Sequence, residues 1–103
     1  MLSRDEMNKV LSDIEKPEDA FWFCNGMVAR NIYELITGIE GLTDVQFVYH
    51  VNTDNNKNDF AKWVKDTLRY PELADLLYKS KKKDEHLDIL RRTVNELEDA
   101  IFQ

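Results

Sequence analysis

Few side chains in this sequence can act as a nucleophile or a base. They are one cysteine, Cys24, two histidines, His50 and His86, and scattered carboxylates. Nucleophilic catalysis needs a cysteine or serine beside a histidine that an acid orients, and Cys24, His50 and Asp59 supply these residue types. Because any chain of this length offers several such sets, we expect no enzyme. A small hydrolase or ligand-binding protein centred on His50 and Asp59 is an alternative, and it requires both side chains to meet in a pocket.

The spacing of these residues gives metal and cofactor binding no support. A structural zinc site takes four ligands at tight spacings, whereas Cys24, His50 and His86 stand far apart, outside any C-x-x-C or H-x-x-x-H element. The three glycines are isolated, so the chain has no glycine-rich loop for a phosphate. We expect neither a metal site nor a cofactor.

The stretch 47–74 has the most specific pattern in the chain. It combines an aromatic Tyr-His pair, an Asn-rich loop and the helix start Asn58-Asp59-Phe60-x-x-Trp63. A histidine such as His50 can act as a pH-sensitive group or a base. The simpler interpretation is a half-buried histidine bonded to a backbone carbonyl, to Asp54 or to Asp59.

A candidate binding surface follows from this stretch. Tryptophan is enriched at interfaces, yet the spacing of Trp63 with the apolar residues around it places it in the core first. Asn58 and Asp59 are both preferred helix caps, so they also have a structural role. The candidate residues are Tyr49, His50, Asn55, Asn58, Asp59 and Trp63.

The charge of the chain is uneven. Twenty acidic and 14 basic residues give a net charge of −6, and the whole excess lies in residues 1–60. An acidic chain does not neutralise phosphates, so we expect no direct nucleic-acid binding. No apolar stretch is long enough to span a bilayer, and the single Cys24 in an apolar run indicates a buried, reduced thiol. These features predict a cytoplasmic protein with no membrane association.

Capping and periodicity predict one mainly α (α+β) domain over 1–103, with five to six helices and a short β-hairpin near 20–30. Ser3, Asn31 and Thr43 each precede a Glu or Gln by three residues, which is typical of a helix start. Asn25-Gly26 is typical of a two-residue hairpin turn. The expected helices are 4–15, 32–40, 44–52, 59–70, 71–79 and 84–102, and the expected strands are 20–24 and 27–30. The segment 44–52 also alternates like a strand.

The C-terminal amphipathic helix 84–102 carries an apolar seam. Its residues recur at alternating spacings of three and four over two heptads. So short a seam favours packing onto the domain's own core, and self-association is the alternative that makes a homodimer the first partner to test. The seam residues are Leu87, Leu90, Val94, Leu97 and Ile101.

Several motifs over residues 18–78 occur together. They are Phe21-x-Phe23, the helix start 31–35, Phe47-x-Tyr49-His50-Val51, Asn58-Asp59-Phe60-Ala61-x-Trp63-Val64-x-Asp66 and Leu73-Ala74. In this order they resemble a family of small, often archaeal, prokaryotic domains of uncharacterised function. The resemblance implies an aromatic opening strand and a shared core, and it implies no activity. The step Arg69-Tyr70-Pro71-Glu72 departs from the Gly-Asp-like step of that family.

The function that these observations favour is a non-enzymatic protein-interaction or regulatory module that self-associates through its C-terminal helix. The first alternative is an acidic inhibitor or decoy that occupies a basic, nucleic-acid-handling surface of another protein, because complementary charge speeds such an encounter. That alternative predicts carboxylates clustered on one face. The sequence does not identify the protein partner.

Overall fold

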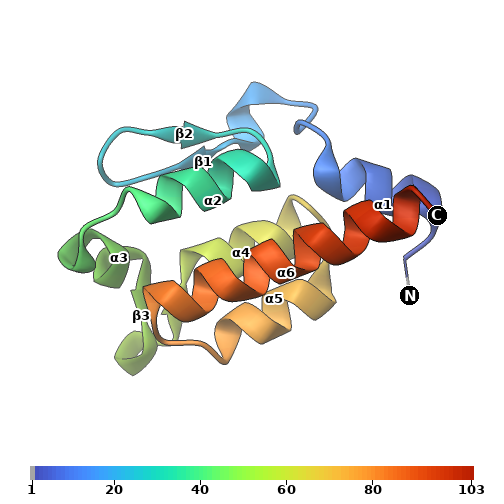
Figure 1. Cartoon of the computed structure of the whole chain (residues 1–103). Coiled ribbons are helices and arrows are strands. Elements are labelled where there is room, and N and C mark those ends of the chain that lie inside the picture. The colour runs from blue at the N-terminus through green and yellow to red at the C-terminus, as the bar shows by residue number, and fades with distance from the viewer. Residues whose placement is uncertain (1) are drawn as a thin grey trace.

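The computed structural model describes residues 2–103, and the predicted mainly α fold with a short hairpin is confirmed (Figure 1). Six α-helices and two antiparallel two-stranded hairpins are present in this range. The helices are α1 (Arg4–Leu11), α2 (Ile32–Glu40), α3 (Asp44–His50), α4 (Asp59–Asp66), α5 (Pro71–Tyr78) and α6 (Lys83–Ile101). The strands are β1 (Phe21–Trp22), β2 (Val28–Ala29), β3 (Val51–Asn52) and β4 (Lys57–Asn58), and single 3₁₀ turns cover Pro17–Asp19 and Thr53–Asn55.

The predicted helix starts are confirmed because their caps are local. Ser3 and Thr43 each form a complete capping box, in which the hydroxyl accepts from the N–H three residues on. The Asn31 side chain accepts from the Glu34 N–H (2.8 Å) and begins α2 at the predicted residue. The sequence of segment 44–52 is compatible with a helix or a strand. Because Thr43 forms a capping box, the segment begins as a helix, and the chain becomes a strand only at Val51.

Two helices end earlier than predicted. α1 stops at Leu11, not residue 15, because the chain turns extended and the Ile14 N–H donates to the Arg30 carbonyl (2.8 Å). α4 stops at Asp66, not Tyr70, since Arg69 adopts a left-handed conformation (φ 58°) and the Tyr70 N–H folds back to the Val64 carbonyl (3.1 Å). Both ends depend on backbone contacts that the helical periodicity does not encode.

The first hairpin lies where the sequence predicts it, but its turn differs. The Phe23 carbonyl accepts from the Gly26 N–H (3.0 Å), and the Phe23 N–H donates to the Met27 carbonyl (2.9 Å). Only Gly26 in this turn has a positive φ (91°), so the loop has three residues with the glycine at the bulge position and not the predicted two. The prediction of a buried Cys24 is also wrong, because strand alternation puts Phe21 and Phe23 inside and leaves Cys24 exposed.

A second hairpin replaces the polar loop predicted after α3. Val51 and Asn52 pair with Asn58 and Lys57, and the connection reverses through Asn56 in the left-handed region (φ 52°). The Asn52 side chain accepts from the Asp54 N–H (3.1 Å), which tightens the turn. This hairpin delivers the end of α3 directly beside the start of α4.

The core lies between α2, α4, α5 and α6, and the first hairpin covers one side of α2 (Figure 1). Phe60 of α4 is fully buried at its centre, with the Phe21 ring at 5.0 Å and the Phe47 ring at 5.9 Å between centroids. α1 packs at the far end of α6, where Arg4 Nη2 donates to the Gln103 carbonyl (3.1 Å). A single contiguous cluster of apolar side chains therefore connects the first hairpin to the last helix.

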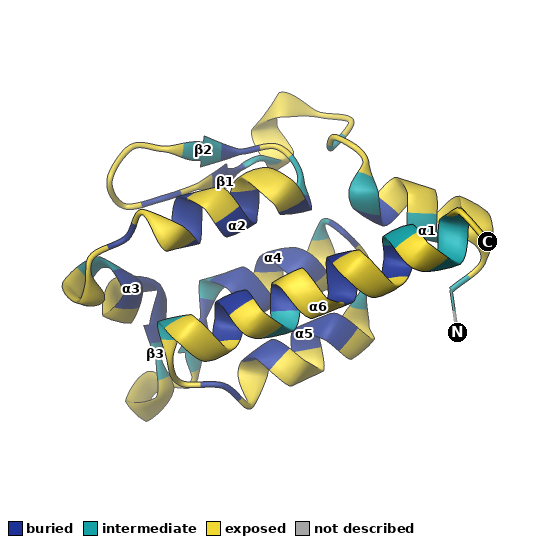
Figure 2. Cartoon of the chain, in the orientation of Figure 1, coloured by how far each residue is buried: buried dark blue, intermediate teal, exposed yellow. Residues whose placement is uncertain are grey.

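The C-terminal seam packs within the chain, as the preferred interpretation of its short length predicts. α6 alternates between buried and exposed residues along its length (Figure 2). The seam residues Leu87, Leu90, Val94 and Leu97 are buried against the other elements, and Ile101 is half-buried. Association through these side chains would require α6 to leave its own core.

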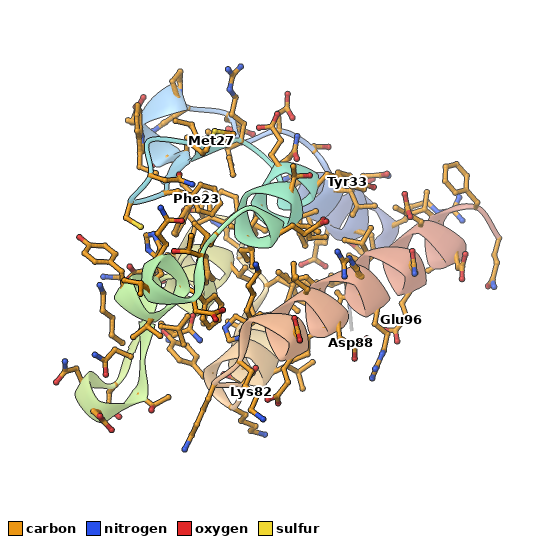
Figure 3. The ribbon with its side chains drawn as sticks, turned by 60° about the vertical axis from the view of Figure 1, so that its left-hand side comes forward. Phe23, Met27, Tyr33, Lys82, Asp88 and Glu96 are labelled. Atoms are coloured by element: carbon orange, nitrogen blue, oxygen red, sulfur yellow. The ribbon has the colours of Figure 1, made fainter. Side chains whose placement is uncertain are left out.

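Gly38 is required for the packing of α2 on the first hairpin. Phe23 lies between the hairpin and α2 (Figure 3), and a Cβ at Gly38 would lie 2.2 Å from the Phe23 Cζ. We expect Gly38→Ala to destabilise the fold by about 2 kcal/mol through overpacking, although alanine favours a helix. Gly41→Ala is the matched control, because its Cβ would meet only atoms at 3.7 Å or more. Urea unfolding measures the free energy of unfolding of both variants. Equal changes in this free energy would contradict the packing role of Gly38.

Candidate functional site

His50 is a buried connector of three elements. It is 3% exposed, its Nε2 accepts from the Cys24 backbone N–H (3.0 Å), and its Nδ1 lies 2.9 Å from Asp59 Oδ2. A backbone N–H can only donate, so Nε2 carries the lone pair and Nδ1 donates its proton to Asp59. His50 thereby joins the first hairpin, α3 and the first turn of α4. Of the three partners considered for His50, the structure has Asp59, and the predicted half-burial of His50 is wrong.

These contacts bring together the residue types of a nucleophilic triad without the geometry that catalysis needs. The basic nitrogen of His50 faces the backbone amide of Cys24, while the Cys24 thiol is directed to the Gln46 carbonyl (3.8 Å). Three aromatic rings enclose the imidazole with centroids at 5.1 to 5.3 Å, those of Phe21, Tyr49 and Phe60. A general base must reach the proton that it takes, so this geometry gives His50 a folding role.

Tyr49 and Asn55 are the predicted site residues that lie on the surface. Tyr49 is 60% exposed, and Lys57 Nζ lies 4.2 Å from the centroid of its ring. The same ammonium group donates to the Tyr49 carbonyl and lies 3.5 Å from Asp59 Oδ2. Asn55 is exposed in the loop of the second hairpin. Lys57 therefore ties this hairpin to α3, and the exposed part of the predicted surface is small.

Asn58 is buried and joins three elements through its amide. Its Oδ1 accepts from the Ala61 N–H (3.0 Å) and caps α4. Its Nδ2 donates to the Leu77 carbonyl at the end of α5 (3.0 Å) and to His86 Nε2 on α6 (3.1 Å). Both the oxygen and the nitrogen of its side-chain amide are bonded inside the protein, so this predicted site residue is structural.

His86 was not predicted to matter, and it completes this network. It is fully buried, and its Nδ1 donates to the Lys82 carbonyl (3.1 Å) and faces the Ser80 hydroxyl (3.0 Å). Its spacing of four from Leu90 and eleven from Leu97 places it on the buried side of α6, a signal that the sequence does contain. Burial lowers the pKa of His86 to about 4, against the opposing pull of the Lys82 carbonyl.

We expect the fold to lose stability as the pH falls from 6.5 towards 4. In the unfolded chain the pKa of His86 returns to about 6.5, so over this interval the unfolded state binds more protons than the folded state. The loss from this group reaches about 3 kcal/mol at pH 4 and levels off within about one pH unit below it. A proton on His86 Nε2 would also face the amide hydrogens of Asn58, so the hydrogen bond between these two side chains would be lost.

Urea unfolding between pH 7 and pH 4 measures this dependence. His86→Gln removes the titrating group, and its free energy of unfolding should fall less steeply over the same interval. The carboxylates titrate in both chains, so the difference between the two curves isolates His86. Parallel curves for the parent and the variant would refute the assignment.

Trp63 is a core residue, as its spacing predicts. It is 8% exposed, and its indole N–H donates to the Asp19 carbonyl (2.7 Å). This bond fixes the 3₁₀ turn Pro17–Asp19, which precedes the first hairpin. Trp63 therefore holds a surface segment in place and is not itself a binding anchor.

Trp22 is the tryptophan that faces solvent, and it is not among the residues predicted for the site. It is 66% exposed on the outer face of the first hairpin. It borders a groove of about 450 Å³ between the hairpin and the extended segment after α1. The groove is lined by Asp13, Ile14, Glu15, Pro17, Ala20, Trp22, Val28 and Arg30. The sequence does contain a signal for the exposure of Trp22. Side chains alternate between the two faces of a strand, so Trp22 lies on the face opposite to Phe21 and Phe23.

Hydrogen bonds hold both walls of this Trp22 groove. The Ile14 N–H bonds to the Arg30 carbonyl (2.8 Å), so the extended segment is attached to β2. The Asp13 carboxylate accepts from Asn31 Nδ2 (2.7 Å) at the start of α2. A groove with fixed walls needs little ordering when a ligand binds, and that favours affinity.

α3 presents a second exposed apolar surface. Val45 is 82% exposed and Val48 55%, and with Tyr49 they share one face of the helix at spacings of three and four. This face belongs to a short helix, and Lys57 lies over the Tyr49 ring. It offers a ligand less enclosure than the groove.

Metal ligands do not gather anywhere in residues 2–103, where no three His, Cys, Asp or Glu side chains are grouped to hold an ion. None of the helices described in that range is long and apolar enough to cross a membrane. No family model matches the chain, and comparisons with curated proteins and with solved structures find no match.

Proposed function

We propose that the protein is a non-enzymatic interaction module that binds a protein partner through the Trp22 groove. The observation that carries this proposal is the exposure of Trp22, two thirds of whose surface lies open beside a groove with an apolar floor. Tryptophan is strongly enriched among the residues that dominate interface energetics. An exposed tryptophan has little to contribute to folding, so its place beside a groove favours a role in binding.

The burial of the other candidate residues supports the same proposal. His50, Asn58 and Trp63 have their polar atoms bonded within the protein, and the C-terminal seam is covered by the domain itself. These residues hold the first hairpin and its neighbours in place. The fold thus supplies a rigid support, and the groove supplies the contact surface.

Site-specific photo-crosslinking tests the proposal. A benzophenone side chain in place of Val28, which lines the groove, should capture one protein when the chain is mixed with a lysate of its native host. Trp22→Ala in the same chain should remove that adduct and leave the thermal midpoint almost unchanged, because the ring is exposed. The matched control carries the benzophenone in place of Glu96, which lies on the outer side of α6 (Figure 3) and should not give the adduct. An adduct that survives Trp22→Ala, or no adduct at position 28, would contradict the proposal.

An acidic inhibitor of a nucleic-acid-handling protein is the second candidate function. The observation that favours it is the concentration of carboxylates near the groove, where Asp13 and Glu15 line the hollow and Glu18 and Asp19 follow in the adjacent turn. If the captured partner handles nucleic acid, an excess of a short DNA duplex should prevent the crosslink, because phosphates and carboxylates compete for the same basic surface. Crosslinking that is unaffected by the duplex would exclude this candidate.

A further inference from the structure

We infer that the Trp22 groove takes a protein segment in which a basic side chain lies next to a large apolar one. This inference rests on the proposed function and adds the chemistry of the partner. It is carried by two features of one surface, an apolar floor and a rim whose charge is predominantly negative.

The floor accepts an apolar side chain. Ile14, Pro17, Ala20 and Val28 line the hollow beside the Trp22 ring. The groove volume of about 450 Å³ leaves room for a side chain of ordinary size together with its backbone. Burying an apolar side chain against these residues removes apolar surface of both partners from water, which favours association.

The rim selects for positive charge. Two carboxylates, Asp13 and Glu15, line the groove together with one basic residue, Arg30. Glu18 and Asp19 follow in the adjacent 3₁₀ turn, and Lys16 precedes that turn. None of these four carboxylates has a basic side chain within 4 Å in the part of the chain that the structure describes. Their charge is therefore available to a lysine or arginine of a partner, and it repels the phosphates of a nucleic acid.

The Trp22 ring suits both parts of such a segment. An indole face packs against an apolar side chain, and it also attracts a cation that lies over it. The structure has one such pairing elsewhere, since Lys57 Nζ lies over the Tyr49 ring. A basic residue beside the apolar anchor can thus contact the ring and the carboxylates together.

Two-dimensional ¹H–¹⁵N NMR with defined peptides tests the inference. The probes are three blocked hexapeptides that alternate Lys with Leu, Glu with Leu, and Lys with Ser. The Lys–Leu peptide should shift the Trp22 indole signal and the amide signals of β2, whereas the other two should not. The indole signal of Trp63, which is buried and bonded to the Asp19 carbonyl, is an internal reference for a change in fold.

Substitutions separate the two features of the surface. Trp22→Ala should lower the affinity for the Lys–Leu peptide by at least about tenfold, as the loss of a hot-spot anchor does. Glu15→Gln should lower the affinity for this peptide by roughly threefold at low salt, which is the scale of one exposed ion pair. Salt at 0.5 M should remove the difference between this variant and the parent chain. Glu96→Gln on the outer side of α6 is the matched control and should have no effect.

Three outcomes would overturn the inference. They are equal binding of the Glu–Leu and Lys–Leu peptides, no shift with any peptide, and groove signals that move on simple concentration of the chain, which would identify a second copy as the occupant. If the crosslink at position 28 depends on Trp22 but the Lys–Leu peptide does not bind, the partner chemistry is wrong and the proposed function stands. If that crosslink is absent, the proposed function fails.

Discussion

Replacing Asn58 by alanine is expected to lower the free energy of unfolding by about 4 kcal/mol. Loss of a helix cap costs about 1 kcal/mol, and each buried acceptor left without a donor costs about 1 to 3 kcal/mol. Asn58→Ala removes the cap of α4 and leaves His86 Nε2 without a donor. It also takes one hydrogen bond from the Leu77 carbonyl, a net loss of about 1 kcal/mol, although that carbonyl keeps the Ser80 N–H. For a domain of this size the thermal midpoint should fall by roughly 20 °C, which differential scanning calorimetry measures.

Two variants separate the parts of this effect. Asn58→Asp retains an oxygen that caps α4 but has no amide hydrogens, so it should remain strongly destabilising at pH 7. At lower pH a proton on His86 Nε2 could bond to the new carboxylate, so Asn58→Asp should lose less stability on acidification than the parent chain. Asn55→Ala is the control of the same residue type in an exposed position, and it should change the stability by less than about 0.5 kcal/mol. If Asn58→Ala lowers the free energy of unfolding by no more than the loss of a helix cap does, the hydrogen bonds of Asn58 to α5 and α6 do not stabilise the fold.

Replacing Phe60 by alanine is expected to cost about 4 kcal/mol, within the range for a buried phenylalanine. Phe60 is fully buried, and its ring lies 5.1 Å from that of His50 and 6.1 Å from that of His86. The cavity would therefore open between both histidines. Urea unfolding followed by near-ultraviolet circular dichroism reports the loss of stability together with the loss of aromatic packing.

Phe102 provides the control for this prediction. It is 85% exposed at the end of α6, so Phe102→Ala should change the stability by less than about 0.5 kcal/mol. Phe60→Leu keeps most of the apolar volume, so its loss of stability should lie between the losses of the two alanine variants. Similar losses for Phe60→Ala and Phe102→Ala would show that Phe60 is not the centre of the core.

Stability and binding are thus expected to depend on different residues. Substitutions at Asn58 and Phe60 should weaken the fold, whereas Trp22→Ala should leave it intact and act on the proposed interaction. The stretch 47–74 is the most distinctive part of the sequence, yet its residues His50, Asn58 and Asp59 serve the fold. A loss of binding on substitution there must therefore be compared with the fraction of folded protein.

The sequence by itself determined the helices and where they begin. Ser3, Asn31 and Thr43 cap helices through atoms only three residues away, so the pattern and the structure agree. The apolar period of α6 likewise predicted a helix, and its short seam favoured packing onto the domain's own core. The acidity of residues 1–60 also follows directly from the sequence.

The tertiary structure alone decided which of these residues face water and which meet one another. Asn58 and His86 are 28 positions apart, and the backbone bond between Ile14 and Arg30 spans 16. These contacts set the end of α1, the role of the histidines and the walls of the Trp22 groove. Local propensity carries no information about them, because they depend on how separate elements pack, and packing is a property of the whole chain.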